Sequence, residues 1–115
     1  MTEVLLQTWF DSNMAGDEWR WEVYATSNGT HWSIKARQVD ENTGQVYRVR
    51  GAYRLKSARG IVAGLDRVFH NDMLGDVGIV WDCIVWGFRQ VDLKMASAIE
   101  DELEGADLRV FRYPI

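Results

Sequence analysis

Hydrophobic and polar residues alternate at every second position over much of the first half of the chain. This is the period of a β-strand that buries one face. Four segments alternate in this way: residues 2–10, 19–25, 31–39 and 45–55. The pair Asn28-Gly29 between the second and third segments is typical of a tight hairpin turn. A hairpin folded about that pair places Ala25 opposite Trp32, with apolar residues on one face.

Apolar residues recur at spacings of three and four in two later segments, which predicts two helices. The first begins after Ser57, a good N-cap residue, and ends at about Asn71. The second runs from Leu93 to Glu104 and begins after Asp92, which is also a good N-cap residue. Each helix carries one apolar stripe, so both are expected to pack on the sheet.

The run Ile79–Phe88 is apolar on both faces except at Asp82, which favours a central strand covered on both sides. In such a strand Asp82 would need an arginine partner, and Cys83 would be a small buried apolar residue. Residues 108–113 predict a last strand. The order becomes β-β-β-β-α-β-α-β over a single α+β domain, residues 1–115, with a mostly antiparallel sheet and two helices packed on it.

The composition of the chain excludes several classes of protein. A length of 115 residues fits one domain. The single cysteine rules out an internal disulfide and a zinc site built on cysteine pairs. No apolar run is long enough for a membrane helix, and no basic leader is visible, so we expect a cytoplasmic protein. Phosphate-loop, dinucleotide-binding, metalloprotease and serine-hydrolase motifs are all missing. We therefore expect no catalytic residues, no metal, no cofactor and no enzyme activity.

The net charge of −4 hides a segregated distribution. Residues 1–19 carry four acids and no base, residues 20–67 carry nine bases and four acids, and residues 68–115 carry nine acids and four bases. Arginine outnumbers lysine, and its planar guanidinium suits interfaces and phosphates. Segregated charge bears on partners and on association rates, not on fold.

The predicted meander places its bases on the side that alternation leaves to solvent. They are Arg20, Lys35, Arg37, Arg48, Arg50 and Arg54. This basic face would suit phosphates or an acidic protein. The plainer interpretation is a solvated face whose charges are balanced by acids elsewhere in the fold. Both interpretations stay open at this point.

A cluster of acids lies at the end of the second predicted helix, where negative charge opposes the helix dipole. It consists of Glu100, Asp101, Glu102, Glu104 and Asp107. Residues that break a local rule can mark function, so the cluster is a candidate docking patch that imitates phosphate charge. Solubilising charge is the alternative. Trp9 and Tyr24 fall on predicted outward positions, which makes them candidate aromatic anchors.

The order β-β-β-α over Trp19–Phe69, with GAYRLKSARGIVAGL at residues 51–65, resembles part of the double-stranded-RNA-binding fold. The resemblance implies a sheet with a helix on one face and a basic helix start at Lys56 and Arg59. As a whole, the small, acidic and aromatic-rich chain is similar to phage-encoded anti-CRISPR inhibitors and to toxin-immunity proteins. That likeness implies a non-enzymatic protein that blocks a macromolecular partner.

The partner expected from these observations is a protein, such as a component of a nucleic-acid-handling complex. A nucleic-acid-binding module that uses the basic face is the alternative function. No membrane partner is expected. The open edges of the predicted sheet leave room for a homodimer.

Overall fold

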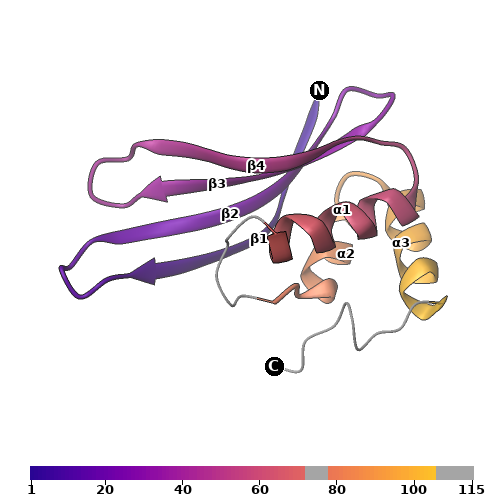
Figure 1. Cartoon of the computed structure of the whole chain (residues 1–115). Coiled ribbons are helices and arrows are strands. Elements are labelled where there is room, and N and C mark those ends of the chain that lie inside the picture. Colours follow the sequence, from indigo (N-terminus) through magenta and orange to yellow (C-terminus); the bar gives the residue numbers. More distant parts are fainter. Residues whose placement is uncertain (72–77, 106–115) are drawn as a thin grey trace.

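The computed structural model describes residues 1–71 and 78–105, and within them a sheet of four strands is followed by three helices (Figure 1). The strands are β1 (Thr2–Ser12), β2 (Glu18–Ser27), β3 (Trp32–Asp40) and β4 (Val46–Leu55). They pair antiparallel in the order β1-β2-β3-β4. The helices are α1 (Ala58–Asn71), α2 (Trp81–Arg89) and α3 (Leu93–Gly105). The predicted α+β class and antiparallel sheet are confirmed.

The hairpin between β2 and β3 forms with a register two residues away from the predicted one. Ala25 pairs with Ile34 instead of Trp32. The cause lies in the turn, where the Asn28 side-chain oxygen accepts hydrogen bonds from two loop N–H groups, at 2.9 and 3.1 Å. This Asx turn holds a four-residue loop in place of a two-residue one. A shift of two residues keeps every side chain on its predicted face.

Strand β1 contains a bulge, and the bulge reverses the alternation of the second half of the strand. The register shifts between Leu5 and Gln7, so one extra residue is inserted there. Beyond the bulge Trp9 turns toward the helices, where it stacks on Trp21 at a ring distance of 6.3 Å and meets Phe69 at 5.8 Å. The expectation that Trp9 projects outward as an anchor is therefore wrong.

The helices form a second layer on one side of the sheet. Helix α1 packs against β3 and β4, α2 packs against β1, and α3 packs against both other helices (Figure 1). The predicted helix at Leu93–Glu104 thus forms, but it lies mainly on helices instead of on the sheet. Ser57 and Asp92 cap as predicted, since their side-chain oxygens accept hydrogen bonds from the N–H groups of Gly60 (3.1 Å) and Met95 (3.0 Å).

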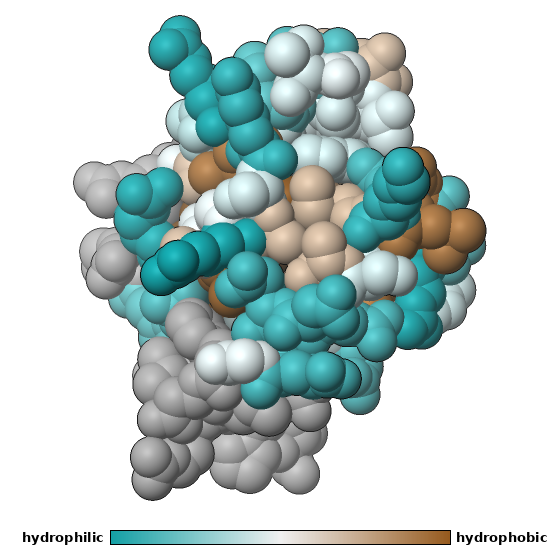
Figure 2. Space-filling view, turned by 90° about the vertical axis from the view of Figure 1, so that its right-hand side faces the viewer, coloured by the Kyte–Doolittle hydropathy of each residue, from teal (hydrophilic) through white to brown (hydrophobic). Residues whose placement is uncertain are grey.

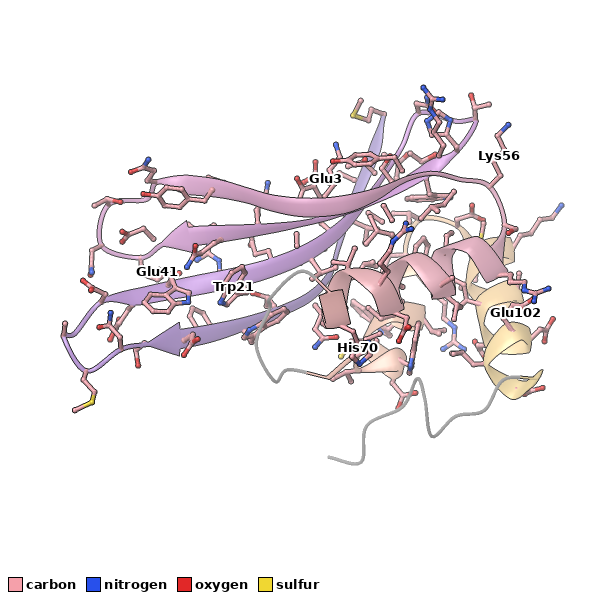
Figure 3. The ribbon with its side chains drawn as sticks, viewed as in Figure 1. Glu3, Trp21, Glu41, Lys56, His70 and Glu102 are labelled. Carbon is pink, nitrogen blue, oxygen red and sulfur yellow. The ribbon has the colours of Figure 1, made fainter. Side chains whose placement is uncertain are left out.

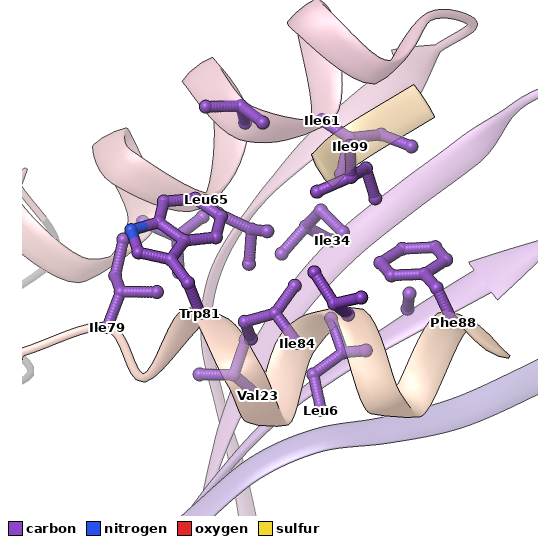
Figure 4. Close-up of a cluster of buried hydrophobic side chains, with 14 of the residues drawn as sticks. Leu6, Val23, Ile34, Ile61, Leu65, Ile79, Trp81, Ile84, Phe88 and Ile99 are labelled. Atoms are coloured by element: carbon purple, nitrogen blue, oxygen red, sulfur yellow. The ribbon is translucent and has the colours of Figure 1, made fainter. Parts of the chain in front are cut away.

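One apolar core lies between the two layers (Figure 4). Side chains from every strand and helix contribute to it, and several are fully buried. They include Val23, Ile34, Ile61, Leu65, Ile84, Phe88 and Ile99. Phe88 meets Trp32 edge-to-face at 5.1 Å, which joins α2 to β3. This packing fixes the positions of α2 and α3, the helices on which the surface described below is built.

The predicted strand at Ile79–Phe88 is wrong, because most of that segment is helix α2. Its buried side chains follow helical spacing: Trp81, Ile84, Val85 and Phe88. Trp86 on the outward side makes the run look apolar throughout, and this hides the helical period. Asp82 and Cys83 are exposed, not buried as expected. Asp82 lies in the first turn, where a carboxylate favours the helix dipole. The predicted strand at residues 108–113 lies outside the described residues.

Candidate protein-binding surface on α2 and α3

The sheet face turned away from the helices carries an ion network centred on Glu22. The Arg37 Nε–H donates to one oxygen of the Glu22 carboxylate at 2.7 Å, and the Arg20 Nε–H donates to the other at 3.3 Å. Arg20 also binds Glu41 at 2.6 Å, and Glu3 lies 3.9 Å from Arg37 (Figure 3). The hydrogen bond to Glu22 raises the pKa of Arg37. Two of the six predicted basic residues are therefore neutralised within the fold.

Tyr24 lies on the same face, but it is not an exposed anchor. Its side chain is only 8% exposed, and the Arg37 guanidinium sits 4.5 Å above the ring centre. This is a cation–π contact, which holds Arg37 over the tyrosine. Alternation correctly placed Tyr24 among polar residues. It did not reveal that a neighbouring arginine covers the ring, so the predicted anchor role is wrong.

The other predicted bases of this face divide into two groups. Lys35 is half-buried opposite Tyr24 in the β2–β3 register, and Arg54 is exposed at a left-handed backbone position with φ of 59°. Among the residues described, neither takes part in the network of Glu22. The backbone register places Arg48 opposite Arg37, and the side chains of Arg48 and Arg50 lie outside the described residues. We call the face defined by Arg20, Glu22, Tyr24, Lys35 and Arg37 the open sheet face.

The acidic cluster lies at the end of α3, as predicted. Asp101 and Glu104 are exposed, Glu102 is half-buried (Figure 3), and Glu100 is bound by Arg89 of α2. The helix has no basic residue in its last turn. Figure 2, which looks onto the side where α3 lies, shows hydrophilic side chains gathered around a paler centre. Asp107 lies outside the described residues.

A pocket of about 290 Å³ between α2 and α3 brings the acidic cluster next to an exposed tryptophan. Glu100 and Glu104 line it from α3, and Asp82 and Trp86 line it from α2 together with Arg89, the partner of Glu100. Trp86 is 63% exposed. The strand prediction put Trp81 and Trp86 on opposite faces but did not assign Trp86 to a site. In a helix Trp86 is two residues from both Ile84 and Phe88, which places it opposite those buried side chains. We call the set Asp82, Trp86, Glu100, Asp101 and Glu104 the acidic surface.

A larger apolar groove of about 640 Å³ lies on the other side of α2, against strand β1. Its walls include Leu5, Leu6 and Trp9 from β1 and Cys83 and Trp86 from α2. We call this the β1–α2 groove. Trp86 and Asp82 line both the groove and the acidic pocket, so the two hollows share one ridge.

Two contacts hold the walls of the groove in place. The Gln7 side-chain amide donates to the Gly78 carbonyl at 3.0 Å and accepts from the Val80 N–H at 2.9 Å, which ties β1 to the start of α2. At the other end a Cβ built on Gly87 would lie 3.0 Å from the Leu6 side chain and 3.3 Å from the Leu5 carbonyl. Glycine at position 87 permits this close approach. These contacts fix the positions of β1 and α2 relative to each other.

Comparison with family models, with curated proteins and with solved structures finds no significant match to this chain. Its function is therefore argued from its own residues. Within residues 1–71 and 78–105, none of the helices combines the length and apolar character needed to cross a bilayer. The same residues contain no group of three or more side chains placed to hold a metal ion.

Proposed function

We propose that this chain is a non-enzymatic binding protein that blocks a basic surface of a protein partner. The observation that carries the proposal is Trp86, a large aromatic residue that is 63% exposed and lines the same pocket as Glu100 and Glu104. Exposed tryptophans of this kind commonly anchor interfaces, and surrounding charges set the approach and the orientation.

The physical features of the acidic surface support this role. Asp101 and Glu104 are exposed carboxylates at a helix end that disfavours them, so their presence there costs stability. Their field attracts a basic partner and accelerates association at low salt. Carboxylates side by side on a rigid helix also resemble the charge of a nucleic-acid backbone. A protein that normally holds nucleic acid in a basic groove is the partner class that fits, which is the mode of an inhibitor of anti-CRISPR or immunity type.

A site-specific photo-crosslinker tests the proposal. It replaces Trp86 in one variant and Tyr53, an exposed residue of β4, in a matched control. Both proteins are incubated with lysate from the source cell, and the products are identified by mass spectrometry. The proposal expects one basic partner captured from position 86 and not from position 53. Capture from both positions, or from position 53 alone, would overturn it.

Binding kinetics with the purified partner then test the separate roles of the acidic charges and of Trp86. Changing Asp101 and Glu104 together to lysine should slow association at low salt by ~10-fold or more, because steered association depends on these charges. Trp86→Ala should instead accelerate dissociation. The control Lys94→Glu changes charge at the opposite end of α3. Unchanged association in the double lysine variant would rule out the acidic surface as the docking site.

The alternative function is nucleic-acid binding through the open sheet face together with Arg54 of β4. Lys35 and Arg54, which stand outside the Glu22 network, favour it. Fluorescence anisotropy with single- and double-stranded DNA and RNA at low salt tests this function. Binding that weakens steeply with salt and is lost in the double variant Lys35→Glu, Arg54→Glu would support it. A lack of binding to all four probes would remove it.

A further inference from the structure

The β1–α2 groove lies where α2 packs beside β1 (Figure 1). Every residue of β1 from Leu5 to Trp9 lines it, and neighbouring residues of a strand point to opposite faces, so the groove borders the edge of the strand. Leu6 lies at its base and is buried in the core (Figure 4). Leu5 is 46% exposed, and Trp86 on the α2 wall is 63% exposed. The groove is thus an open apolar surface on a packed base.

Most polar side chains of the groove already have partners. The Gln7 amide is engaged in its two hydrogen bonds to the start of α2, and the Thr8 hydroxyl donates to the Trp21 carbonyl at 2.8 Å. Asp82 is different. It is the one charged residue among the described residues that line the groove, it is exposed, and it has no ion-pair partner within the described part of the chain. The groove therefore combines apolar walls with a single available carboxylate.

These features define the chemistry of the occupant. Apolar side chains are needed to remove Leu5 and Trp86 from water. A lysine or arginine is needed beside Asp82, because its aliphatic stem lies along apolar walls while its charged end meets the carboxylate. A second copy of β1 does not match, since its charged residues are Glu3 and Asp11 and like charges on neighbouring strands repel.

The groove is continuous with the acidic surface. Asp82 and Trp86 line both the groove and the α2–α3 pocket, so a partner on the acidic surface reaches the groove across one ridge. Interfaces combine an apolar centre with a polar rim, and Trp86 is the one large apolar side chain of the acidic surface. A partner that occupies both hollows encloses Trp86 from two sides, and aromatic residues that water cannot reach contribute most to binding.

We propose that the β1–α2 groove is the apolar half of the docking surface. It takes a segment of the basic partner in which apolar side chains flank a lysine or arginine. The base meets Asp82, and the apolar side chains cover Leu5 and Trp86. This inference rests on the proposed function and deepens it, because it states what the partner carries besides positive charge.

The single cysteine of the chain reports whether the groove is occupied, since Cys83 is exposed on its wall. The rate of Cys83 alkylation by iodoacetamide is measured in the full chain at physiological ionic strength. The probe is a short peptide in which leucine and lysine alternate, and its matched control has glutamate in place of lysine. Saturating lysine peptide should slow alkylation by at least ~10-fold, because reagent reaches only the unoccupied fraction. The glutamate peptide should leave the rate unchanged.

Two sets of variants locate the effect. In the double variant Cys83→Ser, Ser97→Cys the thiol moves to an exposed position of α3 that does not line the groove, and the lysine peptide should not slow its alkylation. Asp82→Asn should weaken the lysine peptide by ~3-fold, the scale of an exposed ion pair. Affinity is taken from the peptide concentration dependence, because Asp82 also neighbours the thiol. Asp101→Asn is the matched control and should leave the affinity unchanged.

The peptide assay needs no partner, so it fails or succeeds separately from photo-crosslinking at position 86. No slowing at Cys83, or equal slowing at position 97, would overturn the groove assignment, while crosslinking still decides the proposed function. Much slower alkylation of Cys83 than of position 97 without peptide would mean a groove that is already covered, and would also overturn it. Slowing at Cys83 alone supports the assignment, and the same slowing is then expected with the purified partner.

Discussion

The open sheet face and the acidic surface are both rich in charge, but they use it in opposite ways. On the open sheet face Arg20 and Arg37 share the carboxylate of Glu22, and Arg37 also covers Tyr24. On the acidic surface Asp101 and Glu104 are exposed at a helix end without basic residues in its last turn. The first arrangement uses charge to hold the sheet face together. The second leaves charge available to a partner. If binding surfaces were chosen by the number of charged residues alone, the arginine-rich face would come first. Whether those charges are already paired within the fold is therefore the better guide to binding.

The largest expected effect comes from Glu22→Ala, which removes the shared acceptor of two arginines. The Glu22 side chain is 12% exposed, so its loss leaves two partly buried guanidinium groups close together. Unfolding in urea should show a loss of about 2 kcal/mol, the scale of hydrogen bonds to charged groups. Glu104→Ala is the control and should change stability by less than ~0.5 kcal/mol. Equal losses of unfolding free energy in Glu22→Ala and Glu104→Ala would show that charge does not stabilise the open sheet face more than the acidic surface.

A smaller effect is expected from Tyr24→Leu, which keeps an apolar side chain and removes the aromatic face under Arg37. Cation–π contacts of this kind contribute about 0.5–1 kcal/mol, and the loss should appear in the free energy of unfolding. Tyr53→Leu is the matched control, because Tyr53 is 51% exposed. If Tyr24→Leu still lowers stability to the same degree in an Arg37→Ala background, the cation–π contact is not the cause.

The double variant Asp101→Lys, Glu104→Lys should be more stable than the natural sequence. Positive charge at the end of α3 complements the helix dipole, and each change should contribute a few tenths of a kcal/mol. The rise is measured as an increase in melting temperature, with Ser97→Lys at an exposed position in the middle of α3 as control. A loss of stability would instead identify these acids as structural and would weaken their assignment to a partner.

The smallest effect is that of alkaline pH on the Arg37–Glu22 pair. The pKa of Arg37 is raised in the folded protein, mainly by its hydrogen bond to Glu22. A raised pKa gives a contribution that is present at lower pH and lost only as pH rises through the folded value, which for arginine lies far above the pH range tested here. The difference in unfolding free energy between Glu22→Ala and the natural sequence should therefore be equal at pH 7 and pH 10. A smaller difference at pH 10 would contradict this account.

The α+β fold was largely predictable because its strands and two of its helices carry clear local patterns. Ser57 and Asp92 mark helix starts, and the alternation in β2 and β3 assigns their faces correctly even though the register differs by two residues. The error at Ile79–Phe88 has a physical reason. Its outward residue Trp86 is as apolar as its buried ones, so the helical period is masked.

The candidate site was predicted only in part. The acidic end of α3 follows from local sequence, since helix position and charge are both visible there. Trp86 as the anchor does not follow, because its exposure depends on how α2 packs against β1 and α3. The pairing of Arg37 with Glu22 and Tyr24 likewise depends on which residues the strand register brings together. Contacts between different strands and helices cannot be predicted from the local sequence of any one segment.

The one extra residue in the β1 bulge reverses which side chains face the helices and which face solvent. Before the bulge the even-numbered residues of β1 face the helices, and after it the odd-numbered residues do. Trp9 is consequently packed against Phe69, while its neighbour Phe10 is 71% exposed. Losing or gaining one residue at this point would exchange the two aromatics between core and solvent. A chain of this fold can therefore acquire a different surface through a single insertion or deletion in an edge strand, with every other residue unchanged.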